Sequence, residues 1–333
     1  MEFGEVPVCD AVGAVLAHSE MAGGSRFRKG QVIDAKVRDA LMASGKATVW
    51  VARLSANDMG ENAAAAAVAQ AVVPDPDAAH LAMSVPFTGR VNLNAVGPGI
   101  VEQDVGAIHR LNRIHPEITL ATLPQYSRVD PGTLVGTVKI ISYGIDAASI
   151  EAAQAAGAGA LRVRPVCLRS AGLILTEVAG QKATLNEKGR QAVEGRLRSL
   201  GIELADCRTV PHEIEAVAHA LKSLEGEIGL ILTGSATSDL HDTAPAAIRA
   251  AGGTVLRFGM PVDPGNLLVM GHLGTRPVIG LPGCARSPAL NGADWVLERI
   301  ACGLDVTDDD IAGMGVGGLL KEIPMRPQPR EPR

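Results

Sequence analysis

The chain is predicted to be an α/β protein with a mostly parallel sheet, and three observations in residues 160–312 support this prediction. Short apolar runs such as Leu230-Ile231-Leu232 are typical of strands buried on both faces. Helical patterns, Asn186 to Leu200 and His212 to Leu224, alternate with these runs. Loops rich in hydroxyl groups or glycine follow them. Alternation at this pitch indicates βαβ units.

Residues 1–73 are predicted to form a small α/β segment. We expect Asp10 to Ala17 to be a helix or its start, and Lys36 to Ser44 to be a helix closed by a glycine. Val49 to Ala52 has the pattern of a strand. The alanine-rich stretch from Asn62 to Val72 is a strong helix former.

Residues 78–147 are predicted to form a small β-rich domain after a joint at Pro74-Asp75-Pro76-Asp77. Strand-like pieces, of which Leu134 to Ile141 is the longest, are separated there by glycine and proline. One helix is expected, from Asp104 to Ile114. Ala148 to Ala160 is expected to be a connecting helix or linker, and no chemistry is evident in this domain.

Residues 160–312 carry the α/β domain, whose first buried strand is Leu173-Ile174-Leu175. Ser287-Pro288 has the pattern of an N-cap with proline at the first helical position, so we expect a helix from Pro288 to Ala301. Residues 313–333 are expected to be a flexible tail or linker, because their second half is rich in proline and charge. The glycines of Gly313 to Gly318 precede no helical pattern and are interpreted as a loop.

Composition excludes several classes of function. The net charge is −5 and aromatic residues make up 2% of the chain, so no basic surface or stacking platform for nucleic acid is expected. The five cysteines are widely spaced and form no Cys-x-x-Cys pair, which favours reduced thiols in a cytoplasmic protein. No apolar run reaches the roughly 18 residues of a membrane span, and the first residues lack a signal-peptide core.

One loop has the pattern of an anion site. Residues 233–242 lie between the apolar run at Leu230 and a helical segment, Thr243 to Ala251, with Pro245 in its first turn. Backbone N–H groups and the positive end of a helix dipole would then face a ligand, usually a phosphate. The expected donors of N–H and hydroxyl groups are Thr233, Gly234, Ser235, Thr237 and Ser238, and an ordinary strand-to-helix loop remains the alternative.

Two further loops are expected in the same region. The first contains Met260-Pro261-Val262-Asp263-Pro264-Gly265, and the second contains Leu281-Pro282-Gly283-Cys284-Ala285-Arg286-Ser287. The guanidinium of Arg286 is suited to phosphate. From these loops we expect Pro264, Gly265, Pro282, Gly283 and Arg286 to contribute to binding.

The three loops together resemble the molybdopterin-binding domain shared by molybdopterin adenylyltransferases and molybdopterin molybdotransferases. Thr233-Gly234 and Asp242-Thr243-Ala244-Pro245 match the Thr/Ser-Gly-Gly and Asp-x-x-Pro elements of that family, Pro264-Gly265 matches its Pro-Gly loop, and Leu281-Pro282-Gly283 matches its third loop. The order and spacing also match. The resemblance implies a three-layer αβα domain that binds molybdopterin, and residues 1–73 resemble the entry segment of the molybdotransferases more loosely.

The resemblance also implies roles for two acids. The family's aspartate at the position of Asp242 lies beside the pterin phosphate and the nucleotide and is implicated in catalysis through Mg²⁺, with ATP as the nucleotide donor. A plain helix N-cap is the alternative for Asp242. Asp239 is a second candidate ligand of Mg²⁺, with a solvated loop acid as its alternative.

The chain departs from the family at two places. Cys284 and Ala285 stand where the third loop usually has Asn-Pro. His212, followed by Glu213, stands where the adenylyltransferases carry an acid. The resemblance therefore implies pterin binding more directly than adenylyl transfer, and His212 is either a base or a structural residue.

Three functional hypotheses follow. The first is a molybdenum cofactor biosynthesis protein that binds molybdopterin and performs adenylyl transfer from Mg-ATP or molybdate insertion. The second is a non-catalytic carrier that holds the cofactor for a nucleotidyltransferase or a molybdoenzyme partner. The third is a nucleotide pyrophosphatase of the competence-damage type. Relatives of this arrangement form dimers or trimers and some continue into a nucleotidyltransferase domain, so a homo-oligomer is expected.

Overall fold

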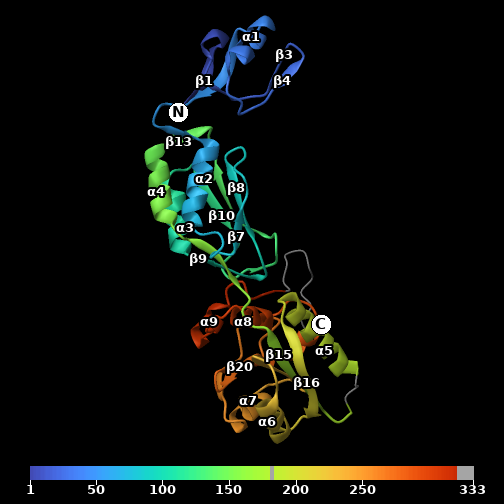
Figure 1. The fold of residues 1–333 in the computed structure, drawn as a ribbon. Helices are drawn as coiled ribbons and strands as arrows, with labels where there is room; N and C mark the ends of the chain where they lie inside the picture. The colour runs from blue at the N-terminus through green and yellow to red at the C-terminus, as the bar shows by residue number, and fades with distance from the viewer. Residues whose placement is uncertain (181–183, 321–333) are drawn as a thin grey trace, which may run out of the picture. The chain divides into compact units, whose positions relative to one another are not determined.

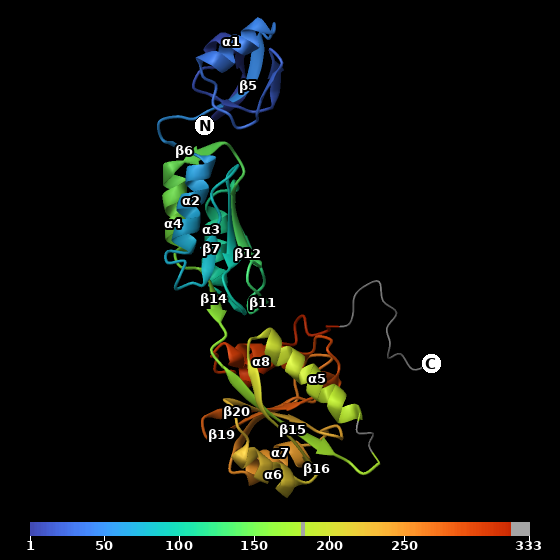
Figure 2. The same cartoon turned by 45° about the vertical axis from the view of Figure 1, so that its right-hand side comes forward.

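The computed structural model describes residues 1–180 and 184–320 (Figures 1 and 2). Most of the tail predicted for residues 313–333 therefore lies outside the described residues. The chain divides into two compact units. Unit 1 is Met1–Gly97 with Val101–Arg164, and unit 2 is Pro98–Ile100 with Pro165–Arg333.

The first part of unit 1 is built on the sheet β1-β5-β2. It contains β1 (Glu2–Pro7), η1 (Val8–Asp10), β2 (Val15–Leu16), a hairpin of β3 (Glu20–Ala22) and β4 (Ser25–Phe27), α1 (Ala35–Ala43) and β5 (Thr48–Arg53). The helix expected over residues 36–44 and the strand expected over residues 49–52 are confirmed. The helix expected over residues 10–17 is wrong: Gly13 has a φ of +85°, and the chain then enters β2 to pair with β5.

The rest of unit 1 is an antiparallel sheet covered by three helices (Figures 1 and 2). The sheet order is β10-β12-β8-β7, and α2, α3 and α4 share its apolar core. The bounds are α2 (Glu61–Val72), β7 (Leu81–Met83), β8 (Arg90–Ala95), α3 (Val105–Ile114), β10 (Ile118–Thr122), β12 (Leu134–Ile140) and α4 (Ala147–Gly157). Smaller pairings join β6 (Asp58–Gly60) to β13 (Gly144–Asp146), and β9 (Gly99–Gln103) to β11 (Arg128–Val129) and β14 (Leu161–Pro165).

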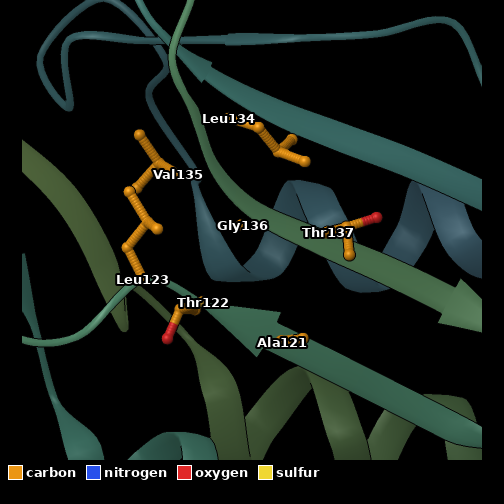
Figure 3. A pocket seen from close by; sticks show the side chains of 7 residues that line it. All are labelled: Ala121, Thr122, Leu123, Leu134, Val135, Gly136 and Thr137. Atoms are coloured by element: carbon orange, nitrogen blue, oxygen red, sulfur yellow. The ribbon is translucent and has the colours of Figure 1, made fainter. Parts of the chain in front are cut away.

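A small apolar hollow lies at the start of β12, where the strand has a bulge. The register between β12 and β8 shifts between Leu134 and Gly136. A pocket of about 210 Å³ opens there, lined by Ala121 to Leu123 and by Leu134 to Thr137 (Figure 3). None of the described residues that line it is charged, so the pocket has no side-chain cation that could pair with an anion.

Unit 2 is organised by a six-stranded sheet of order β16-β15-β17-β20-β19-β18. The strands are β15 (Ser170–Glu177), β16 (Glu203–Pro211), β17 (Ile228–Leu232), β18 (Thr254–Phe258), β19 (Val269–Leu273) and β20 (Arg276–Leu281). β16, β15, β17 and β20 are parallel, and β19 is antiparallel to both of its neighbours. The predicted mostly parallel sheet is confirmed.

Helices cover both faces of this sheet, so unit 2 has the three layers that were expected (Figure 2). On one face, α5 (Thr184–Ser199), α8 (Gly292–Ala301) and α9 (Asp308–Gly313) pack on Leu173, Leu175 and Leu230. On the other, α6 (Ile214–Ser223) and α7 (Thr243–Ala250) pack on Ile174 and Ile231. Neighbouring strand residues face opposite layers, which explains why the strand sequences are continuously apolar.

The start of α8 corrects a sequence prediction. The helix begins at Gly292, and Asn291 is its N-cap in place of Ser287. The side chain of Asn291 accepts a hydrogen bond from Ala293 N, and Asp294 accepts one from Asn291 N, each at 2.8 Å. This reciprocal cap satisfies two backbone N–H groups at the start of the helix, Ala293 N and Asn291 N, which is more than a single serine side chain would satisfy. Residues 283–286 form a short 3₁₀ helix instead.

Residues 314–320 lie against the loop that follows β18. Asp263 N donates to Gly318 O at 2.8 Å, and Leu320 N donates to Asp263 O at 2.9 Å. Met314 is buried. Within the described part of the chain, no helix combines the length and apolarity needed to cross a membrane.

Candidate functional site

The loops singled out in the sequence leave the same edge of the unit 2 sheet. Leu232, the last residue of β17, pairs with Leu175 of β15 and with Leu281 of β20. The loops after β17 and β20 therefore start side by side. β18 runs in the same direction as β20, since β19 is antiparallel to both, so the loop after β18 also leaves at this edge. In open α/β sheets, ligands bind at the carboxyl ends of the strands.

The loop of residues 233–242 is held at its first turn. Thr233 is buried, and its hydroxyl donates to Ser235 O at 2.6 Å. Gly234 N donates to Thr176 Oγ1 at 2.7 Å, which ties the loop to the end of β15. Thr237 is buried, whereas Ser235 and Ser238 are exposed. The two serines are therefore the hydroxyls that a ligand can reach from solvent.

The His212 side chain connects two elements next to this loop, β15 and α7. Its Nδ1 lies 2.9 Å from Thr176 Oγ1, and its Nε2 lies 3.1 Å from Thr243 Oγ1. The ring thus connects the end of β15 to the first residue of α7. Both ring nitrogens are occupied by hydroxyls, which is the arrangement of a structural histidine.

Asp242 is the N-cap of α7. Its Oδ1 accepts from Thr243 N at 2.7 Å, and its Oδ2 accepts from Ser238 N at 3.0 Å. The carboxylate therefore closes the loop on itself and satisfies an N–H at the helix end. Asp239 is exposed, and its Oδ1 accepts from His241 N at 2.7 Å. Among the described residues, no three of His, Cys, Asp and Glu gather as a metal-binding group.

Arg286 links the third loop to the first. Its Nη2 donates to Thr233 O at 2.7 Å, and its Nη1 donates to Leu185 O at 3.2 Å. Burial lowers the pKa of this guanidinium. A side chain at Gly189 of α5 would come within 2.8 Å of Arg286 Nη1, so this glycine makes room for the arginine. Arg286 thus holds the backbone of the first loop in place.

The second loop is joined to the start of α8. Pro264 O accepts from Gly292 N at 2.8 Å. Gly265 has a φ of +146°, and a Cβ there would lie 2.8 Å from Gly292 N. Only glycine fits a backbone that is both in this conformation and this close to a helix. Pro282 starts the third loop, where its carbonyl accepts from Ala285 N at 2.8 Å, and Gly283 is exposed.

Arg196 of α5 was not anticipated from the sequence. Its guanidinium forms an ion pair with Asp294, and both side chains are 11% exposed. It also donates to Ala285 O at 2.9 Å, Ser287 O at 2.8 Å and Ala289 O at 3.0 Å. One buried side chain therefore fixes the backbone of the third loop. No local pattern indicates this role, since the partners lie about ninety residues away in sequence.

The geometry defines a class of protein: an α/β domain in which three loops leave one edge of a mostly parallel sheet. Side chains from elsewhere in the domain hold the backbone of these loops in place. Comparison with known families gives a match for this domain. Residues 174–300 match a family described as "Probable molybdopterin binding domain", so this part of the chain is similar to molybdopterin-binding domains. Residues 5–53 match a domain of unknown function (DUF8806).

A crystal structure of a molybdopterin biosynthesis MoeA protein from Pyrococcus horikosii aligns with 90% of this chain and 75% of that chain, with 13% identity and a TM-score of 0.32. A search of curated proteins gave no match.

Proposed function

We propose that unit 2 binds molybdopterin with its phosphate on residues 233–242, beside the N-terminus of α7. The observation that supports this most is the convergence of three loops at one sheet edge in a domain that matches the molybdopterin-binding family. The first N–H groups of α7 and its dipole favour an anion there. Ser235 and Ser238 add exposed hydroxyl groups.

The negative charge of Asp242 opposes the binding of a phosphate at this loop. A phosphate close to its carboxylate would meet a repulsion of about 1–3 kcal/mol at a separation of about 5 Å. Mg²⁺ removes that repulsion, and it is usually held by one or two carboxylates together with substrate phosphates. Each oxygen of Asp242 accepts a hydrogen bond and has a second lone pair that a cation can use. We therefore infer that the phosphate binds together with Mg²⁺.

The step that follows binding separates two candidate functions. The first is adenylyl transfer from Mg-ATP to the bound phosphate, or insertion of molybdate. The second is a carrier that holds the pterin for a separate or fused nucleotidyltransferase. The hydrogen bonds of His212 to Thr176 and Thr243 favour the carrier, because the residue that replaces the family's acid is engaged in the structure. Incubation with molybdopterin and Mg-ATP tests the first reaction, because adenylyl transfer yields adenylated pterin. Incubation of the bound pterin with molybdate tests the second reaction, because insertion yields a molybdenum-containing pterin, and a carrier yields neither product.

The binding proposal is tested by titrating molybdopterin with and without Mg²⁺ and following pterin fluorescence. We expect Mg²⁺ to tighten binding by roughly tenfold, in line with the repulsion above. Asp242→Asn should abolish this dependence on Mg²⁺, and Ser235→Trp should weaken binding in both conditions. The matched control is Asp146→Asn, because Asp146 is also a helix N-cap: its carboxylate accepts from Ser149 N in the first turn of α4 at 2.8 Å. Unchanged affinity in both test variants would refute the proposal.

A further inference from the structure

A second hollow lies within unit 1, apart from the loops described above. Its volume is about 320 Å³, and it is lined by Lys29, Gly30, Glu61, Thr88, Lys139, Ile141 and Tyr143. The volume is at the lower end of the range for ligand pockets. The family match at residues 5–53 includes only two of these residues and carries no known function.

Lys139 and Glu61 form the inner wall. The ammonium of Lys139, on β12, donates to Thr88 O and lies 4.0 Å from Glu61 Oε2. The two side chains are only 26% and 20% exposed. Glu61 opens α2, and its backbone N donates to Tyr143 O at 3.0 Å. Both charged groups are therefore held in place while they face the hollow.

Lys29 and Tyr143 form the outer wall. Lys29 Nζ lies 5.4 Å from the centre of the Tyr143 ring, which is within cation–π range. The Tyr143 hydroxyl donates to Ala17 O at 2.7 Å. The ring of Tyr143 is stacked on that of Phe3, with 6.3 Å between their centres. The tyrosine thus gives the hollow a fixed, flat apolar side.

The charges around the hollow do not balance. Lys29 and Lys139 line it and Arg90 stands near Lys139, whereas Glu61 is the only acid among the described lining residues. Burial, followed by the repulsion of Arg90 and Lys29, lowers the pKa of Lys139, although Glu61 opposes the shift. Positive groups collected in a half-enclosed space favour an anion that enters it, because the low local dielectric strengthens the attraction.

We propose that this pocket binds a small oxyanion, the phosphate or carboxylate group of a small metabolite. Lys139 and Lys29 would each donate a charge-assisted hydrogen bond to it, and the rest of the ligand would lie along Tyr143 and Ile141. Glu61 limits the affinity for the anion and orients Lys139. The proposal concerns unit 1 alone, and it stands whether or not unit 2 binds a pterin.

The experiment uses Trp50 as a reporter. The chain has two tryptophans, so Trp295→Phe leaves Trp50, whose ring centre lies 5.7 Å from that of Phe3, the ring that is stacked on Tyr143. The probes are inorganic phosphate and, separately, acetate, titrated at constant ionic strength. A saturable change in Trp50 fluorescence with phosphate alone identifies a phosphate site, and one with both identifies a site for carboxylates as well.

Charge variants in this background test the assignment. Lys139→Met should weaken binding of the probe by tenfold or more, and Glu61→Gln should tighten it several-fold. Lys36→Met, which removes an exposed lysine of α1, should leave it unchanged. Should Lys139→Met not fold, Lys29→Met at the exposed rim provides the same test. The proposal is overturned if neither probe gives saturation, or if the lysine variants bind like the parent.

Discussion

The two proposed anion sites, the sheet edge of unit 2 and the pocket of unit 1, would attract an anion by different means. At the edge, the proposed donors are backbone N–H groups beside a helix end, and the carboxylate that caps this helix, Asp242, is negative. In the pocket, the donors are the ammonium groups of Lys29 and Lys139. Main-chain donors select by direction and distance, whereas ammonium groups attract by charge. The Debye length is about 10 Å at 0.1 M salt, so added salt weakens the attraction that the ammonium groups exert on an approaching anion.

The largest effect is expected at the edge, from Arg196→Leu. This change leaves Asp294 without its buried partner and removes the donor to three carbonyls of the third loop, so it should cost about 3–5 kcal/mol of unfolding free energy. Urea denaturation measures it. Arg198→Leu on the same helix is the control, because its partner is Glu194 and it is 76% exposed, and it should cost less than about 1 kcal/mol. Equal costs in the two variants would contradict the role given to Arg196.

A smaller effect is expected from two glycines of α5. In Gly189→Ala, the new Cβ would lie 2.8 Å from Arg286 Nη1 and from Leu232 Cδ2, which should cost about 1–3 kcal/mol and weaken pterin binding. In Gly195→Ala, nothing lies within 4 Å of the new Cβ, so the variant should gain up to about 1 kcal/mol from helix propensity. Thermal unfolding and pterin titration measure both. Opposite signs are the expected result, and a stabilised Gly189→Ala would show that Arg286 moves freely.

The smallest effect concerns ionisation in the pocket. Burial raises the pKa of Glu61, although Lys139 and Lys29 oppose the shift. A carboxyl with a raised folded pKa costs stability when it is ionised, and this cost disappears as the pH falls through the folded pKa. Glu61→Gln should therefore stabilise unit 1 at neutral pH by less than about 1 kcal/mol after solvent screening. Urea midpoints should show this advantage shrinking as the solution is acidified, and an advantage that grows instead would contradict the assigned sign.

Most of the unit 2 fold could be predicted from the sequence, because its information is local. The runs at Leu173 and Leu230 are apolar on both faces, which is characteristic of central parallel strands, and their helices have clear 3.6-residue patterns. The ends of the helices and strands were harder to predict. Ser287-Pro288 is a good local cap, yet α8 starts at Gly292 because Asn291 and Asp294 cap it mutually and Arg196 holds the residues before it. Competition between two local signals is decided by tertiary contacts.

In unit 2, the sequence by itself determined most of the alternation of strands and helices and the loops that leave the sheet edge, since hydrophobic period and turn residues act over a few positions. Only the tertiary structure decided how those loops are held. His212 links Thr176 to Thr243, Arg286 reaches Thr233, and Arg196 reaches Ala289, all across dozens of residues. The same holds for Lys29, Glu61 and Lys139. Charges that are scattered along a chain become a site only when folding brings them together, because electrostatic attraction depends on distance in space and not on separation in sequence.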